Sequence, residues 1–111
     1  MQNMKKSRKI LDELIGYFTT HQINELDIHF KNTQGQLNIT ISGKTPAKPK
    51  DMDTLEQLLN TTRHPEYEEY FWGLLGSSSN QSEISLLGNL VDGGDVSYEN
   101  GILTVSIRRK E

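Results

Sequence analysis

The chain has 111 residues, of which 33% are hydrophobic and 24% are charged, and its formal net charge is −3. Leu, Ile, Val and Phe make up about a quarter of the residues, more than the roughly 20% below which disorder is expected, so we expect a single folded domain over residues 1–111. The lack of cysteine excludes disulfide bonds, thiol nucleophiles and cysteine-bound zinc, and no apolar run is long enough for a membrane-spanning helix. We therefore expect a cytoplasmic protein with no membrane partner.

A helix is predicted over residues 3–20. Its apolar side chains recur at helical spacing on one side of the axis: Ile10, Leu11, Leu14, Ile15 and Phe18. Tyr17 widens this apolar arc, and a single sheet is not expected to cover all of it.

Two segments with strand-like alternation follow, at residues 26–31 and 37–42. Apolar side chains alternate with polar ones in both segments, which predicts a hairpin with one apolar and one polar face. A four-residue loop at 32–35 predicts the facing pairs Leu26 with Ile41, Ile28 with Ile39, and Phe30 with Leu37.

Residues 43–50 contain two prolines and three lysines without periodicity, which predicts a linker inside the domain. A short helix is predicted after it, ending near residue 60, because Asp53 and Glu56 have the spacing of a capping box. His64 and Pro65 predict the start of another helix.

Residues 83–91 fit either a helix or a buried strand, and we favour a helix. Alternating residues then flank Asn100-Gly101, a strong signal for a two-residue hairpin turn. Centring the hairpin on this turn predicts the facing pairs Tyr98 with Leu103 and Val96 with Val105.

Together these elements predict an α+β domain, with a four-stranded antiparallel sheet made of two hairpins and helices packed on one face. The predicted order is α-β-β-α-α-(α)-β-β. Segments 37–44 and 103–110 place their apolar residues similarly, and each follows a hairpin turn. Strand alternation explains most of this match, and an ancient duplication is the alternative.

No motif predicts catalysis or a metal site, and no cofactor is expected. The nearest candidate is a pocket near His64, Glu66 and Glu69, which would suit a small-molecule-binding protein or an enzyme. Carboxylates at the start of a helix more often complement the helix dipole. We therefore favour a structural role for these residues and regard an enzyme as the less favoured class.

The segment 12–18 and the strand that ends at Lys44 are similar to the helix and paired strands of histidine-kinase-type ATPases. The resemblance covers about a third of the chain and implies a magnesium-binding role for Glu13. Tyr17 stands at the family's Asn position and Ser42 at its Asp position, so the residues for magnesium and adenine are missing. Membership of this family is not predicted.

Basic residues cluster near both ends of the chain: Lys5, Lys6, Arg8, Lys9, Arg108, Arg109 and Lys110. If the two ends meet on one surface, these side chains form a basic patch for nucleic acid. The acidic net charge and the lack of outward aromatic residues on the predicted strands make nucleic-acid binding the third hypothesis.

The preferred hypothesis is a non-catalytic protein-interaction or regulatory module, which associates with itself as a homodimer or with another protein. It rests on surplus apolar surface. Trp72 lies off the inward stripe of its predicted helix, beside Glu68, and Tyr17 and Ile15 lie at the margins of the first helix. Packing of Trp72 beneath a neighbouring loop is the open alternative.

Overall fold

The computed structural model describes residues 4–61 and 87–110 of the chain. Within these ranges the elements follow the order α1 (Met4–Thr20), β1 (Leu26–Thr33), β2 (Gln36–Lys44), α2 (Met52–Leu59), β3 (Gly93–Glu99) and β4 (Ile102–Lys110). The helix predicted to start at His64 lies outside the described residues. So do residues 83–86 of the predicted helix 83–91, of which residues 87–91 are described.

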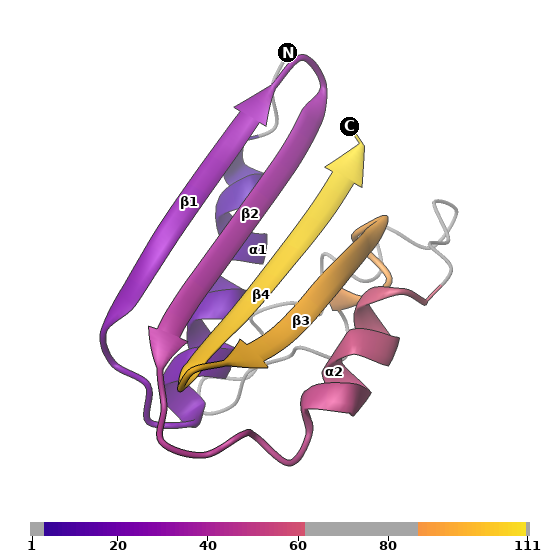
Figure 1. Cartoon of the computed structure of the whole chain (residues 1–111). Helices are drawn as coiled ribbons and strands as arrows, with labels where there is room; N and C mark the ends of the chain where they lie inside the picture. The colour runs from indigo at the N-terminus through magenta and orange to yellow at the C-terminus, as the bar shows by residue number, and fades with distance from the viewer. Residues whose placement is uncertain (1–3, 62–86, 111) are drawn as a thin grey trace.

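The four strands form one antiparallel sheet in the order β1-β2-β4-β3, so that each hairpin occupies one half of the sheet (Figure 1). α1 packs across one face, mainly against β2, and α2 packs beside β3. The predicted α+β class, with an antiparallel sheet of two hairpins, is confirmed. No helix in the two described ranges is long and apolar enough to span a membrane.

The second hairpin has the predicted register. Tyr98 lies opposite Leu103 and Val96 opposite Val105. The turn residues Asn100 and Gly101 have φ angles of 54° and 77°, the positive values that a type I′ turn requires. Asparagine and glycine tolerate these angles better than other residues, which is why this short signal predicts the register correctly.

The first hairpin has a different register from the predicted one. Ile28 lies opposite Ile41 and Phe30 opposite Ile39, so that every pair is displaced by two residues. The cause is a two-residue turn at Gln34-Gly35, with φ angles of 54° and 74°, in place of the predicted four-residue loop. Because the displacement is an even number of residues, the apolar side chains remain on one face.

The two hairpins are equivalent in geometry. Each paired residue of the second hairpin lies 66 positions after its counterpart in the first, and the two turns keep the same spacing. The pairing of β2 with β4 at the centre of the sheet is consistent with this relation. The sheet therefore has approximate two-fold symmetry, and its edge strands β1 and β3 occupy equivalent positions.

The hydrophobic core lies between the sheet and its helices. Alternate residues of the two central strands are buried on the α1 side: Leu37, Ile39, Ile41, Leu103, Val105 and Ile107. α1 contributes Ile10, Leu14 and Phe18 to this core, and α2 contributes Leu55 and Leu59. Three further buried side chains come from the segment before β3: Leu87, Leu90 and Val91.

The start of α2 differs from the predicted capping box. The helix begins at Met52, and Asp51 precedes it without making a side-chain cap hydrogen bond. Its carboxylate instead accepts a hydrogen bond from the Tyr17 hydroxyl at 2.9 Å and lies 3.2 Å from Nε2 of His21. This contact ties the chain before α2 to the end of α1.

The segment between β2 and α2 is shorter than the linker predicted at residues 43–50. β2 continues through Gly43 and Lys44, and the chain has neither helix nor strand from residue 45 to residue 51. A side chain at position 43 would bring its Cβ within 2.5 Å of Ile23 Cγ2, so the close approach of the α1–β1 connection requires glycine there.

Candidate functional site

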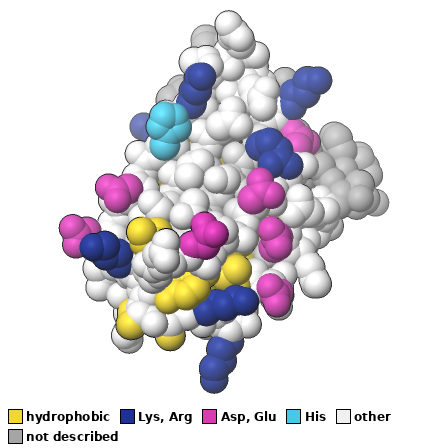
Figure 2. Space-filling model, viewed as in Figure 1, with side chains coloured by type: hydrophobic (Ala, Val, Ile, Leu, Met, Phe, Trp, Pro, Cys, Tyr) yellow, Lys and Arg dark blue, Asp and Glu magenta, His cyan; other side chains and the backbone are white. Residues whose placement is uncertain are grey.

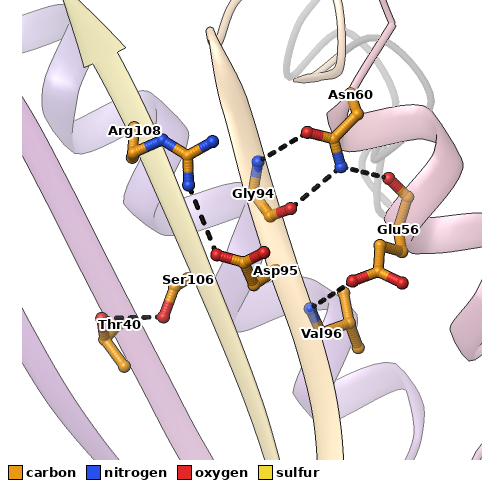
Figure 3. Close-up of polar contacts among 8 residues, drawn as sticks. All are labelled: Thr40, Glu56, Asn60, Gly94, Asp95, Val96, Ser106 and Arg108. Carbon is orange, nitrogen blue, oxygen red and sulfur yellow. Dashed lines mark hydrogen bonds and ion pairs between the residues drawn. The ribbon is translucent and has the colours of Figure 1, made fainter.

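The outer edge of β3 is covered by side chains of α2 and of Asn60, the residue that follows α2 (Figure 3). The side-chain amide of Asn60 donates a hydrogen bond to the Gly94 carbonyl at 2.9 Å and accepts one from the Gly94 N–H at 3.3 Å. The Glu56 carboxylate accepts a hydrogen bond from the Val96 N–H at 3.3 Å. Asn60 and Glu56 thus bond to backbone groups that a further strand would otherwise use.

Gly94 allows α2 to approach this closely. A Cβ atom at position 94 would lie 2.6 Å from the Ser106 carbonyl oxygen and 2.9 Å from Leu59 Cδ1. Real Cβ atoms do not approach other atoms so closely, so any side chain here would displace α2 or β4. The glycine is therefore part of the arrangement that covers the β3 edge.

The opposite edge of the sheet, along β1, has no such cover. The two-residue turn makes Thr33 and Gln36 a hydrogen-bonded pair, so the backbone groups of alternate residues Leu26, Ile28 and Phe30 point away from β2. Within the described part of the chain, no hydrogen bond reaches these outward groups. β1 therefore presents a row of backbone donors and acceptors to solvent.

Apolar side chains accompany this open edge. Leu26 and Phe30 are half-buried, and Ile28 is 44% exposed, whereas its neighbour Ile41 on β2 is fully buried. The difference arises because α1 lies mainly against β2 and leaves the outer strand partly uncovered. We define the β1 edge as residues Leu26–Thr33, with this apolar row on its helix side.

The other face of the sheet is open, and Figure 2 views it: most of its exposed side chains are polar, and hydrophobic side chains appear toward the lower part of the view. Half-buried uncharged side chains line the two central strands: Asn38, Thr40, Ser42, Thr104 and Ser106. Thr40 and Ser106 lie within hydrogen-bonding distance at 3.0 Å, and Arg108 donates to Asp95 at 3.3 Å (Figure 3). On β1, this face carries three exposed ionisable residues in alternate positions, Asp27, His29 and Lys31.

The predicted interaction residues differ in whether the structure describes them and in how far they are buried. Trp72 and Glu68 lie outside the described residues, and Ile15 is half-buried against the core. Tyr17 is only 3% exposed, which corrects the expectation that it lies at an uncovered margin of the helix. Its ring packs against Phe18 and His21, and its hydroxyl bonds to Asp51, so it is not available to a partner.

The predicted pocket residues His64, Glu66 and Glu69 also lie outside the described residues. The described part of the chain does have a hollow of about 470 Å³ where β1 begins and β2 ends. Side chains that are mostly exposed line it: Gln22, Asn24, Glu25, Asp27, Ser42, Lys44 and Ile102. Because ligand sites usually bury most of a small ligand, this hollow does not favour small-molecule binding.

The seven predicted basic residues do not form one patch. Arg109 is 5% exposed and donates a hydrogen bond from Nη1 to the Leu90 carbonyl at 2.6 Å, so its charge is not on the surface. Strand alternation places Arg108 and Lys110 on the open face of the sheet, and α1, which carries Lys5, Lys6, Arg8 and Lys9, packs on the opposite face. The sheet therefore separates the two groups of basic side chains.

Comparison with known proteins gives no family assignment. The chain matches no protein-family model, and no curated protein is similar to it in sequence. In the described ranges, no group of three or more acidic or histidine side chains is placed to hold a metal ion.

Proposed function

We propose that this chain is a protein-interaction module, and that it binds an extended segment of its partner at the β1 edge. The observation that carries the proposal is the difference between two equivalent edges. Asn60 and Glu56 bond to the N–H and carbonyl of Gly94 and to the N–H of Val96 on β3, whereas the outward groups of Leu26, Ile28 and Phe30 on β1 have no such contacts among the described residues.

Unprotected edge strands are unusual because they can pair with any other extended chain. Proteins commonly block them with charges, bulges or covering segments, as this chain does at β3. Where an edge stays open and carries exposed apolar side chains, addition of a partner strand is a recurrent mode of recognition. The backbone bonds then supply affinity, and alternate side chains supply specificity.

The proposal is tested with an extended probe peptide of a sequence unrelated to β1, Lys-(Thr-Val)₃-Lys, in excess over the isotopically labelled chain. We expect shifts of the backbone amide signals of Leu26, Ile28 and Phe30, and none at Gly94 and Val96, whose N–H groups are already bonded. Unchanged β1 amides, or equal shifts along β3, would contradict the proposal.

Two substitutions at one position separate backbone pairing from side-chain contact. Ile28→Pro removes an outward N–H that β2 does not use, and proline is tolerated on edge strands. Ile28→Thr keeps the N–H and the β-branched shape but removes apolar surface. We expect the proline variant to lose the amide shifts and the threonine variant to keep them in weakened form.

A further inference from the structure

We infer that the partner at the β1 edge is a second copy of this chain, whose β1 strand pairs antiparallel about a two-fold axis at His29. This inference rests on the proposed function and adds the identity of the partner and its register. The inference depends on one register in which the side chains of β1 match those of β1 in a second copy.

Hydrogen-bond geometry limits the possible registers. Antiparallel strands exchange bonds between residues whose backbone groups point toward each other, so outward residues of one copy must face outward residues of the other. With the axis at His29, Ile28 of one copy lies opposite Phe30 of the second copy, and the reverse pair follows by symmetry. Each of these two pairs exchanges two backbone hydrogen bonds.

The same register pairs the apolar side chains. Ile28 and Phe30 lie on the helix side of the sheet, where α1 leaves them partly exposed. Facing each other across the axis, they extend the apolar surface of one copy into that of the other. Water is thereby removed from Ile28, which is the most exposed large apolar side chain among the described residues at 44%.

On the open face, the register pairs opposite charges. Asp27 lies opposite Lys31 of the second copy, and this pair occurs twice. Both residues are exposed, and they occupy non-hydrogen-bonded positions, where facing side chains are closest, with Cα atoms about 4.5 Å apart. Opposite charges in such positions stabilise strand pairing, and like charges destabilise it.

Neighbouring registers fit less well. Moving the axis to Phe30 places Lys31 opposite His29 of the second copy and leaves Ile28 facing the polar Asn32. Moving it to Ile28 reduces the overlap of strand residues from 26–32 to 26–30, because β1 begins at Leu26. The axis at His29 therefore combines the Asp27–Lys31 pairs with an overlap that is as long as the one at Phe30 and longer than the one at Ile28.

The test uses charge reversal in the full chain, followed by sedimentation velocity over a range of concentrations. We expect the wild type to dimerise, and Asp27→Lys and Lys31→Asp each to weaken the dimer roughly tenfold or more, because each creates two like-charge contacts. Glu99→Lys, an equal change of charge at an exposed site on β3, is the control and should dimerise as the wild type does.

Recovery of the dimer after the opposite-charge pairs are re-formed distinguishes a specific register from a general effect of charge on association. A mixture of Asp27→Lys chains with Lys31→Asp chains restores both opposite-charge pairs, and so does the double variant in one chain. With the axis at Ile28, the double variant would instead place its basic side chain at position 27 opposite His29 and its acidic side chain at position 31 opposite Glu25, and it would stay weak. Recovery of the dimer in the mixture also shows that both single variants are folded.

Failure of this inference can be told apart from failure of the proposed function. A wild-type chain that stays monomeric at high micromolar concentration overturns the second copy as partner, while binding of the probe peptide would still support the β1 edge as a docking site. Single variants that dimerise as tightly as the wild type, or a mixture that is not restored, overturn the register.

Discussion

Tyr17 is the residue that joins the end of α1 to the chain entering α2. It is buried, and its hydroxyl donates to the Asp51 carboxylate, which also lies against His21. His21 Nδ1 donates in turn to the Tyr17 carbonyl at 2.8 Å. Burial, assisted by the hydrogen bond and the negative charge of Asp51, raises the pKa of the Tyr17 hydroxyl well above its ordinary value.

The raised pKa of Tyr17 predicts a loss of folding stability at alkaline pH. In the unfolded chain a tyrosine ionises near pH 10, whereas folded Tyr17 keeps its proton above that pH. The folded state then binds more protons than the unfolded state, so the free energy of unfolding falls as pH rises above about 10. In Tyr17→Phe this contribution is absent, and we expect a shallower decline in urea denaturation measured from pH 9 to pH 12.

Substitution of Tyr17 and of its partner Asp51 also tests what raises the pKa of the Tyr17 hydroxyl. At neutral pH, Tyr17→Phe should lose about 1 kcal/mol of stability with its hydrogen bond to Asp51. Asp51→Asn keeps an oxygen acceptor but removes the charge, so its alkaline decline should lie between those of the wild type and Tyr17→Phe. A decline in Tyr17→Phe as steep as in the wild type would contradict this account.

The sequence shows that Tyr17 lies at the margin of an apolar arc, but not what covers it. Its partner Asp51 lies 34 residues away, after a segment without periodicity. Local spacing carries no information about that contact, which depends on how the segment returns across the end of α1. The same limit applies to Arg109, whose burial depends on the Leu90 carbonyl on the far side of a hairpin.

At the scale of elements, the two turns have the same backbone shape but different sequences. Gln34-Gly35 and Asn100-Gly101 have closely similar positive φ angles. Asparagine adopts the left-handed conformation more readily than glutamine, which explains why the second turn is recognisable in the sequence and the first is not. The wrong register of the first hairpin follows from this single difference.

Exchange of the two turn residues should therefore change stability in opposite directions. We expect Gln34→Asn to raise the free energy of unfolding by about 0.5 kcal/mol and Asn100→Gln to lower it by a similar amount. Urea denaturation of the two single variants measures both effects. Changes of the same sign would show that the turns differ in more than their residue preference.

At the scale of the whole molecule, the difference between the edges depends on the order of the strands. Alternation in residues 26–30 indicates a strand with one apolar face, and this holds whether the strand is central or at an edge. Only the pairing of β2 with β4 places β1 on the outside, and only the position of α2 covers β3. The fold class was predictable from local patterns, whereas the candidate interface was not.

The covered edge also limits the size of the proposed assembly. Two copies joined at β1 would form an eight-stranded sheet whose outer strands are both β3, and Asn60 and Glu56 would cover each end. A two-fold interface of this kind closes on itself and stops at two copies. The cover at β3 is therefore as important to the assembly as the opening at β1.

Removal of this cover should therefore have two measurable effects. In Asn60→Ala, we expect faster hydrogen exchange of the Gly94 amide, which loses its acceptor, and the appearance of species larger than a dimer in sedimentation velocity. Gln57→Ala, an exposed position on the same helix, is the matched control. Unchanged protection of Gly94 would show that Asn60 does not cover the edge in solution.

The central position of β2 and β4 also determines the order in which the chain can fold. Each hairpin closes through a two-residue turn and can form within microseconds. The ladder between β2 and β4 joins residues 58 to 74 positions apart, from Lys44 with Ile102 to Gln36 with Lys110. Closing so long a loop costs conformational entropy before the central contacts form, so we expect the pairing of two preformed hairpins to be the slow step of folding.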